Sequence, residues 1–490
     1  MPVNNPPAPS VAKGTLGGAG GSCTGVVVYG TYKKDVAADT TNYLTVAVNV
    51  TAPGSYSISS DTINGLYFRD TGTFAATGIS SVQLKANGKP LATGVHMFSL
   101  RYDSSKCSFE LAVVDANNKI GSTVFIGSTD GNLYALEALS GKLKWKFTAS
   151  GIIVSSPTVM GNLVIFGSAD RTLYAVNAIT GLLEWKFYTG SEPTGGVIQQ
   201  TPAAGNSMVY FSCENGKLYA IDTTVQILNG IKYPNQKWQS VYGNSPGVSN
   251  SSPAIANGVV YVGASDNTCY AYDAQTGTQK WKYALNEASN RSNPVVANNA
   301  VYVFTQNSTV YALQAATGVL IWQKNTDNGY GTGAYFSSPT VANSTLYVAS
   351  THIGASTNQV CAMDITNGSI KWFSDPPPQA AGIIVGGLAV YNGLLYGGSD
   401  NGYLYAWDAA TGKLQWAYNT TGTHIYNSPT VANDIVYIAD ENSTVHAINA
   451  ATGQLKWKTK VSNGRIAYSA ACVVDLAGVI HHPGDSGEQN

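Results

Sequence analysis

Short apolar stretches alternate with polar turns along most of the chain, and from residue 121 onward the pattern repeats about every 40 residues. Residues 131–147 read GNLYALEALSGKLKWKF, and residues 171–187 read RTLYAVNAITGLLEWKF. Within each unit, runs rich in Val, Ile and Tyr are separated by Asn-Gly, Asp-Gly or Thr-Gly, which supply the positive φ angles of tight hairpins. Four short strands in about 40 residues predict the blade of a β-propeller.

The tryptophans count the blades, because eight of the nine close one unit each: Trp145, Trp185, Trp238, Trp281, Trp322, Trp372, Trp416 and Trp457. Two longer intervals locate the insertions TTVQILNGIKYPNQ and STHIGASTNQ. The first unit, near Gly121, has no Ser-Pro strand of its own, whereas GRIAYSAACVVD after Trp457 is a strand of that kind without partners. An all-β, eight-bladed propeller over residues 118–475, closed by its C-terminal strand, is therefore predicted.

The first segment has a different pattern, with strands that do not repeat. NYLTVAVNV places Leu44, Val46, Val48 and Val50 on one face, as in a half-buried strand, and further short strands follow up to residue 117. The pattern predicts a small antiparallel β-sandwich of the immunoglobulin type over residues 23–117. Pro- and Gly-rich residues 1–22 predict a flexible tether, and residues 476–490 a disordered tail.

Composition limits the partners and the location of the protein. Charged residues make up 11% of the chain and the formal net charge is -1, which argues against nucleic acid or an anionic membrane as a partner. No apolar run is long enough for a membrane helix, and the N-terminal residues do not read as a signal peptide. Small polar residues in place of charges favour export, so we expect a mature form located outside the cell, at its surface, at the outer membrane or in the periplasm.

The six cysteines have none of the spacings of metal-binding or thioredoxin-like motifs. Cys23 and Cys107 lie at the two ends of the first segment, where a disulfide can join its outer strands. The other four are expected to be buried free thiols. The six histidines form no metal-binding motif, so no metal site is expected.

The repeat also carries a family resemblance. The unit AxDAxTGxxxW, present at residues 271–281 and 406–416, resembles the tryptophan-docking repeat of the quinoprotein-like propellers, also called PQQ-like repeat proteins. That superfamily includes dehydrogenases that use pyrroloquinoline quinone (PQQ) and non-enzymatic members such as the propeller lipoprotein of the outer-membrane barrel assembly machinery. The resemblance covers about three quarters of the chain and implies the fold, in which the docking tryptophan packs between blades.

A second resemblance concerns the first segment. Residues 54–78, GSYSISSDTINGLYFRDTGTFAATG, resemble immunoglobulin-like modules of secreted and surface proteins in the Bacteroidetes group. Such modules act as spacers or adhesion units.

The dehydrogenase members imply a particular set of site residues. They carry a vicinal disulfide over the quinone, a carboxylate and an asparagine around a metal ion, an aspartate base and a tryptophan floor. This chain has no adjacent cysteines and no acidic cluster near its Ser-Pro strands, so no cofactor is expected. Trp407 is the one tryptophan outside the docking position; it is either a floor for a planar ligand or, as we favour, a core aromatic residue. His446 replaces a repeated tyrosine and is expected in the core or at a blade edge.

The candidate binding surface follows from propeller geometry, because the innermost strand of each blade lines the channel. Residues just before each Ser-Pro should then surround one mouth: Gln200, Asn250, Arg291, Tyr335, Tyr426 and Tyr468, with His424 and Arg465 close by, and with Val154, Phe336 and Val385 completing the ring. This mixture of aromatic, amide and cationic groups is typical of a surface that binds a peptide or a sugar. A water-filled vestibule without a ligand is an equal alternative.

Together these patterns predict an exported, non-catalytic propeller that presents a rigid face to a protein or glycan partner. A PQQ-dependent dehydrogenase is one alternative. Another is a structural subunit that assembles with itself into a filament or surface layer.

Overall fold

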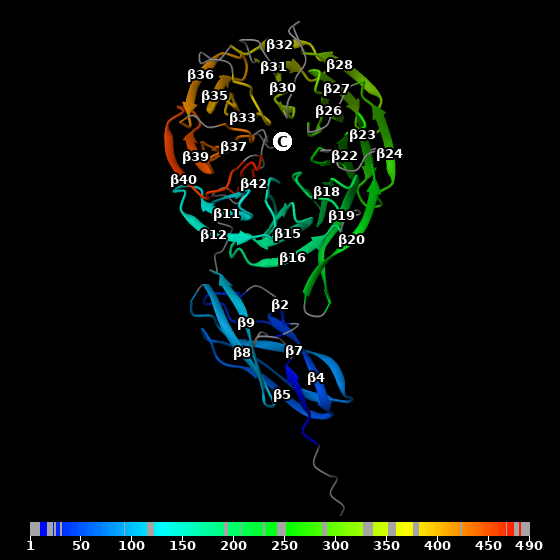
Figure 1. The fold of residues 1–490 in the computed structure, drawn as a ribbon, viewed down its shortest axis with the longest axis vertical. Helices are drawn as coiled ribbons and strands as arrows, with labels where there is room; N and C mark the ends of the chain where they lie inside the picture. The colour runs from blue at the N-terminus through cyan, green and yellow to red at the C-terminus, as the bar shows by residue number, and fades with distance from the viewer. Residues whose placement is uncertain are drawn as a thin grey trace, which may run out of the picture. The chain divides into compact units, whose positions relative to one another are not determined.

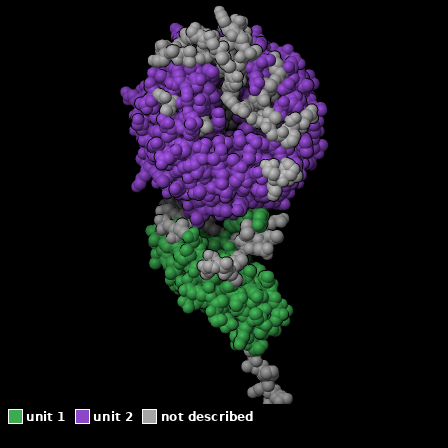
Figure 2. Space-filling model, viewed as in Figure 1, with its two compact units in different colours: residues 1–119, 225–233 green, residues 120–224, 234–490 purple. Residues whose placement is uncertain are grey.

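The computed structural model describes residues 10–16, 23, 26–29, 32–92, 94–114, 122–190, 195–205, 207–228, 231–242, 251–286, 292–326, 337–350, 359–375, 382–421, 424–466, 468–474 and 480–481. The regular elements of these residues are all strands. Within this part of the chain, no helix is long and apolar enough to cross a membrane. The chain divides into two compact units, residues 1–119 with 225–233 and residues 120–224 with 234–490 (Figure 2).

The first unit is built around one nine-stranded sheet in the order β1-β4-β7-β6-β5-β8-β9-β3, with β2 paired to β4. Its strands are β1 (Lys13–Leu16), β2 (Val27–Tyr29), β3 (Tyr32–Lys33), β4 (Tyr43–Ala52), β5 (Gly54–Ser60), β6 (Leu66–Phe74), β7 (Gly78–Gly88), β8 (Gly94–Tyr102) and β9 (Ser105–Val114). Pairing is antiparallel except between β3 and β9, which run parallel.

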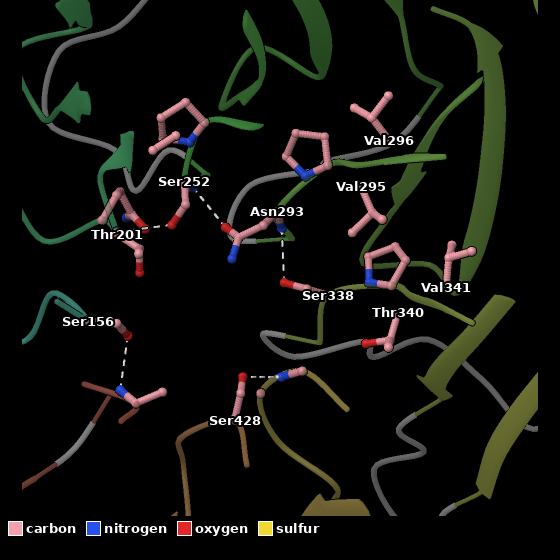
Figure 3. Close-up of a pocket in the computed structure, with 18 of the residues that line it drawn as sticks. Ser156, Thr201, Ser252, Asn293, Val295, Val296, Ser338, Thr340, Val341 and Ser428 are labelled. Atoms are coloured by element: carbon pink, nitrogen blue, oxygen red, sulfur yellow. Dashed lines mark hydrogen bonds between the residues drawn. The ribbon is translucent and has the colours of Figure 1, made fainter. Parts of the chain in front are cut away.

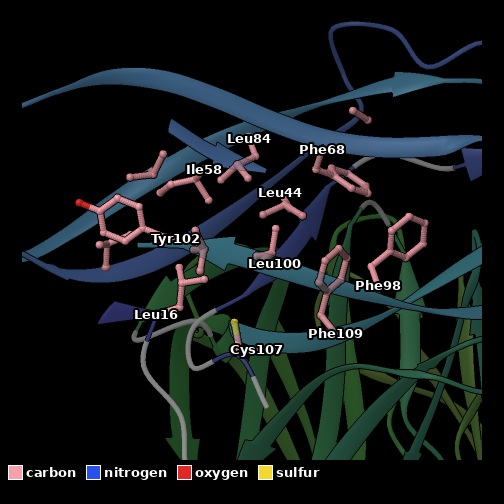
Figure 4. Close-up of a cluster of buried hydrophobic side chains, with 14 of the residues drawn as sticks. Leu16, Leu44, Ile58, Phe68, Leu84, Phe98, Leu100, Tyr102, Cys107 and Phe109 are labelled. Carbon is pink, nitrogen blue, oxygen red and sulfur yellow. The ribbon is translucent and has the colours of Figure 1, made fainter. Parts of the chain in front are cut away.

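Alternating apolar residues build the core of this unit. Leu44, Val46, Val48 and Val50 are at most 1% exposed, which confirms that they share one face. The rings of Phe68, Phe98 and Phe109 pack within 5.6 Å of one another in the same core (Figure 4). The expected disulfide between Cys23 and Cys107 is present.

The expectation of a flexible tether over residues 1–22 is wrong for residues 13–16. Lys13–Leu16 forms β1, which pairs with β4 of the sheet. Ala12, Gly14 and Leu16 are buried while the residues between them are exposed, so this stretch has the two-residue period of a half-buried strand.

The second unit is an eight-bladed propeller, as predicted (Figure 1). Each blade is an antiparallel sheet whose innermost strand comes first below: β41 (Cys472–Val474), β10 (Thr123–Gly127), β11 (Asn132–Glu137) and β12 (Leu143–Thr148) in blade 1; β13 (Thr158–Met160), β14 (Leu163–Gly167), β15 (Thr172–Asn177) and β16 (Leu183–Tyr188) in blade 2; β17 (Ala203–Gly205), β18 (Met208–Cys213), β19 (Lys217–Leu228) and β20 (Ile231–Val241) in blade 3; β21 (Ala254–Ala256), β22 (Val259–Ala264), β23 (Thr268–Asp273) and β24 (Gln279–Ala284) in blade 4.

The remaining four blades follow the same order: β25 (Val295–Ala297), β26 (Ala300–Phe304), β27 (Thr309–Gln314) and β28 (Leu320–Asn325) in blade 5; β29 (Thr340–Ala342), β30 (Thr345–Ser350), β31 (Gln359–Asp364) and β32 (Ile370–Phe373) in blade 6; β33 (Ala389–Tyr391), β34 (Leu394–Gly398), β35 (Tyr403–Asp408) and β36 (Leu414–Asn419) in blade 7; β37 (Thr430–Ala432), β38 (Ile435–Ala439), β39 (Thr444–Asn449) and β40 (Leu455–Lys460) in blade 8.

Seven of the eight docking tryptophans pack against the turn glycine of the next blade. The indole N–H of Trp281, for example, donates to the carbonyl oxygen of Ala315 in the next blade at 2.9 Å. The ring lies so close to Gly318 that a Cβ there would be 2.6 Å from it, which explains why the Thr-Gly turn carries glycine. Trp185 is the exception, because the blade that follows it has the long β19–β20 hairpin in place of this turn, and its buried indole N–H has no hydrogen-bond partner.

The ring closes through the C-terminal strand, as predicted. β41 pairs with β10, although more than 300 residues separate them in sequence. At the same seam, Trp457 and Tyr437 of the last blade both donate to the carbonyl oxygen of Ala138 in the first, at 2.9 and 3.0 Å.

The expectation of a disordered tail over residues 476–490 is wrong at two residues. Ile480 and His481 form a further strand, β42 (Ile480–His481), which pairs with β41. Ile480 is half-buried and packs against apolar side chains of the first two blades, so this part of the tail is held by apolar contacts as well as by pairing.

Candidate functional site

The propeller encloses a central cavity of about 1030 Å³. Its walls are the Ser-Pro segments and innermost strands of the blades, including all of β25 and β29 (Figure 3). The volume is at the upper end of the range for small-molecule sites, and it would also admit an extended peptide segment.

A chain of hydrogen bonds from blade to blade holds the Ser-Pro segments in place (Figure 3). The residue before the proline, or the residue at the same position in the two blades that lack the proline, donates its backbone N–H to the side chain of the equivalent residue in the next blade, at 2.7–3.0 Å: Ala470 to Ser156, Thr201 to Ser252, Ser252 to Asn293, Asn293 to Ser338, and Gly387 to Ser428. Gly387 and Ala470 have no side-chain acceptor, so two of the eight junctions cannot make this bond. The repeated serine is thus structural.

The described lining of the cavity carries no charged side chain. Ser, Thr, Asn and Gln supply its polar groups, and Val, Ala and Pro supply its apolar surface. Such a wall can hydrogen-bond a ligand but offers no counterion, which favours uncharged polar groups over ions.

Aromatic and charged side chains gather at the part of the rim formed by blade 8 and the seam with blade 1. The rings of His424 and Tyr426 stack with centroids 5.2 Å apart, and the ring of Tyr468 lies 5.9 Å from that of Tyr426. Tyr426 and Tyr468 also line the cavity, and Tyr468 is 48% exposed. We call His424, Tyr426 and Tyr468, together with Glu441 and Arg465, the aromatic rim.

The charges of the aromatic rim are paired with each other. Arg465 Nη1 lies 2.9 Å from Glu441 Oε1, and His424 Nε2 lies 4.0 Å from the other carboxylate oxygen of Glu441. The Arg465 side chain is 72% exposed, so one face of its guanidinium is accessible to a partner.

A hydrogen bond orients the ring of His424, and the surroundings of Tyr426 favour its protonated form. The carbonyl oxygen of Asp400 accepts a hydrogen bond from Nδ1 of His424, which orients the imidazole. Burial raises the pKa of Tyr426, and the carboxylates of Glu441 and Asp400 raise it further. The phenol therefore stays protonated at neutral pH and can donate a hydrogen bond.

The structure places five of the eight rim residues expected from the sequence. Tyr426, Tyr468 and Gln200 line the cavity, while His424 and Arg465 stand beside it in the aromatic rim. The other three, Asn250, Arg291 and Tyr335, lie outside the described residues, as does Phe336, which was expected to complete the ring. Val154 lines the cavity, and Val385 is buried.

Two site residues were missed from the sequence. Gln199 lines the cavity together with Gln200 and is the residue of blade 3 that corresponds to Tyr426 and Tyr468. Glu441 could have been noticed, because a carboxylate stands there where the first two blades have Thr129 and Ala169.

The residues present do not fit the set expected for PQQ. Trp407 is fully buried and packs against Tyr405 inside blade 7, which confirms the interpretation as a core residue. The four cysteines outside the disulfide are buried and lie in separate blades. The described cavity wall has no carboxylate, and the described residues contain no cluster of His, Cys, Asp and Glu suited to a metal ion.

His446 is a core residue, as expected. Its Nε2 lies 3.0 Å from Asp440 Oδ2, and its Nδ1 lies 3.0 Å from the hydroxyl of Tyr418. The imidazole is 1% exposed and the carboxylate 4%, so this pair is sealed inside blade 8 and cannot reach a ligand.

Two solved structures with TM-scores above 0.5 confirm the fold. The computationally designed protein Ika8 is 16% identical, with a TM-score of 0.52 over 67% of this chain and 95% of its own. Quinohemoprotein alcohol dehydrogenase ADHIIG from Pseudomonas putida HK5 is 15% identical, with a TM-score of 0.53 over 66% of this chain and 68% of its own. BamB from Moraxella catarrhalis is 17% identical, with a TM-score of 0.40 over 73% and 89%. The comparison with curated proteins found no match.

A family model matches residues 119–230, 290–385 and 379–480, which together make up more than half of the chain. The matched segments contain six of the eight docking tryptophans and the strand that closes the ring. The chain therefore belongs to the PQQ-like repeat family whose description is outer membrane protein assembly factor BamB.

Proposed function

We propose that this chain is a non-catalytic binding protein that receives a protein partner at the aromatic rim. The observation that carries the proposal is the placement of exposed Tyr468 and Arg465 at the mouth of a large cavity whose described lining carries no charged side chain. Tyrosine and arginine are enriched at the centres of protein interfaces, because they combine apolar area with directed hydrogen bonds.

The family supports a protein partner and an envelope location. Its description names an assembly factor of outer membrane proteins, a function performed by binding other polypeptides. An exported location at the outer membrane, in the periplasm or at the cell surface is consistent with the low charge content of the chain.

The first unit is proposed to be an immunoglobulin-like spacer. Its order β1-β4-β7-β6 followed by β5-β8-β9 matches the A-B-E-D and C-F-G sheets of that fold when the strands are lettered along the chain. A spacer needs no ligand site of its own, so the binding activity is assigned to the propeller.

The test is site-specific photo-crosslinking in extracts of the native host's envelope. A photoreactive phenylalanine at Tyr468 should trap a discrete polypeptide, and Tyr426→Ala in the same chain should reduce the yield several-fold. Tyr188 is the matched control, because it is 53% exposed on the outermost strand of blade 2. Equal trapping from Tyr188 and Tyr468 would contradict a specific site at the rim.

Three further measurements test the competing functions. PQQ with calcium is titrated into the purified protein while reduction of an artificial acceptor by alcohols and sugars is followed; saturable binding with turnover would show that the chain is an enzyme. Binding of neutral oligosaccharides that is lost in Tyr468→Ala would replace the protein partner by a glycan. Association that rises with concentration in size-exclusion chromatography would favour a structural subunit.

A further inference from the structure

The innermost strand of blade 1 has a partner that the other inner strands lack. In blades 2 to 8 the described sheets end at the inner strand, whose second edge faces the channel. In blade 1 that edge of β41 is taken by β42, which pairs Val473 with His481 and Val474 with Ile480 (Figure 1). The channel edge of this propeller therefore accepts an added antiparallel strand.

The added strand lies at the seam of the ring. β42 pairs with β41 and also lies next to β37, the inner strand of blade 8. The described residues that line the cavity include all of β25 and β29 but none of β33, β37 or β41. β42 therefore lies along two inner strands where the ring closes, in the blades that carry the aromatic rim.

We propose that the channel edge of β41 is a strand-addition site for an extended segment of the protein partner, and that β42 holds this site closed until the partner replaces it. The proposal rests on the proposed function, since it names how the polypeptide partner binds. Addition of a strand to an exposed edge is a common mode of peptide recognition.

The pairing between β42 and β41 involves so few residues that another strand can replace β42. It has two residue pairs, and the apolar contact comes from half-buried Ile480, which packs against the apolar cluster that includes Val474, Phe125 and Val159. Each backbone hydrogen bond adds only about 1 kcal/mol. A partner segment that pairs with more residues and has its own apolar side chain at the place of Ile480 would bind more strongly.

The cavity suits such a segment in its chemistry. β42 runs antiparallel to β41, from Val474 toward Val473, and so points toward Ala470, which lines the cavity. The wall offers serine, threonine and amide groups without charge, which match a polar, uncharged peptide backbone. The partner segment is thus expected to be extended, with an apolar anchor followed by small polar residues.

The experiment uses the chain's own tail as the probe. A fluorescein-labelled peptide of residues 476–490 is titrated into a chain that ends at residue 475 and into the full chain, and polarisation is measured. The shortened chain should bind the peptide at least about tenfold more tightly, because its site is not occupied in cis. Equal affinity for both chains, or no binding to either, would overturn the proposal.

Matched peptides test the anchor. Ile480→Asp in the peptide should abolish binding, since it places a charge against the apolar cluster around Phe125. Gln489→Asp adds the same charge outside β42 and should bind like the native peptide. Equal weakening by both changes would show that charge alone acts, which contradicts strand addition.

A second variant covers a failure of the shortened chain to fold. Ile480→Asp in the full chain should loosen β42 without removing it, and should also bind the native peptide. Loss of the fold in both variants would overturn the proposal, because the propeller could not then release this strand. Sedimentation of the same samples shows whether chains exchange tails with each other; dimers in place of peptide binding would overturn a partner-derived strand.

The outcome is independent of the test of the proposed function. Peptide binding needs only the purified chain, whereas trapping at Tyr468 needs the partner. Peptide binding without trapping would support the strand-addition site and contradict the rim as the contact with the partner. Trapping without peptide binding would support the rim and contradict the strand-addition site. If both hold, the chain ending at residue 475 should trap several-fold more partner than the full chain.

Discussion

Single carboxylates fix the turns inside several blades. Asp130 accepts a hydrogen bond from the backbone N–H of Asn132 at 3.0 Å and another from the hydroxyl of Tyr134 at 2.6 Å. The same aspartate–tyrosine pair recurs in the second blade at Asp170 and Tyr174. A residue that reads as a generic turn aspartate in the sequence is therefore a fixed acceptor for a tyrosine four positions later.

The paired aspartate predicts a pH dependence of stability. Burial raises the pKa of Asp130, but hydrogen bonds from Tyr134, Asn132 and Ser128 outweigh it, so the pKa lies below its ordinary value. The pKa of this carboxyl is thus lower in the folded protein than in the unfolded chain, where it is about 4. The contribution of Asp130 to stability is lost as the pH falls through the folded pKa. The unfolding free energies of the native protein and Asp130→Asn should differ most above about pH 4, and the difference should shrink as the pH falls through the lowered pKa of Asp130. A constant difference would contradict this.

Blade 8 replaces the tyrosine with His446, which pairs with Asp440 in the same core. Removing the imidazole takes away the group that lies 3.0 Å from Asp440 Oδ2, while the backbone N–H of Thr444 still donates to Oδ1, so His446→Phe should lower the free energy of unfolding by about 1–3 kcal/mol. Tyr418→Phe removes only the hydroxyl that meets the other ring nitrogen and should cost less. Urea unfolding of both variants makes the comparison, and an equal loss in both would assign the stability to Tyr418.

At the scale of elements, the docking turn requires glycine for two separate reasons. Gly318 and Gly258 have the same φ of 73°, but a Cβ at Gly318 would lie 2.6 Å from Trp281, whereas a Cβ at Gly258 would meet nothing within 4 Å. Alanine at either position carries the strain of the left-handed conformation, about 1–2 kcal/mol. Only Gly318→Ala also displaces the tryptophan.

These two glycines therefore form a matched test of the blade interface. Gly318→Ala should destabilise the protein by about 1–3 kcal/mol more than Gly258→Ala, the range for overpacking. The measurement is chemical unfolding followed by tryptophan fluorescence. Equal losses of unfolding free energy in the two variants would show that the turn conformation, and not the contact with Trp281, explains why glycine recurs in the Thr-Gly turns of this chain.

The disulfide between Cys23 and Cys107 is a covalent crosslink within the first unit. It closes a loop between residues separated by 84 positions, so its loss should lower the free energy of unfolding by about 2–4 kcal/mol. A variant with Cys23→Ser and Cys107→Ser should unfold at lower denaturant concentration than the native protein. A reductant should shift the native protein toward the variant and leave the variant unchanged; a shift in both would locate the effect at the other cysteines.

Repetition explains which elements were predictable. Eight docking tryptophans indicated the blade number, and the unpartnered strand after Trp457 indicated the closure, because each unit repeats the same pattern. β1 and β42 were missed, since strands of four and two residues carry too little pattern and exist because β4 and β41 offer them an edge. Tyr426 and Tyr468 were found from propeller geometry, but Glu441 was not, because its role arises only when Arg465 meets it at the seam.

At the scale of the whole molecule, the ring has one seam, and it joins the two ends of the propeller segment. β41 supplies the inner strand of blade 1, while Trp457 and Tyr437 share one carbonyl acceptor across the same junction. The aromatic rim and β42 lie beside this seam. The place where the chain closes is thus also the place where the binding features gather, so exchange at β42 must leave β41 in position.

This separation between closure and exchange gives the last prediction. A chain that ends at residue 466 lacks β41 and leaves the edge of β10 open, with fully buried Val124, Phe125 and Ile126 next to it. An open edge beside apolar residues favours association, so this chain should form oligomers or aggregates. The chain that ends at residue 475 keeps β41 and should retain the mass of the full chain. Light scattering after size exclusion compares them; a compact monomer for the shorter chain would mean that the ring does not depend on its C-terminal strand.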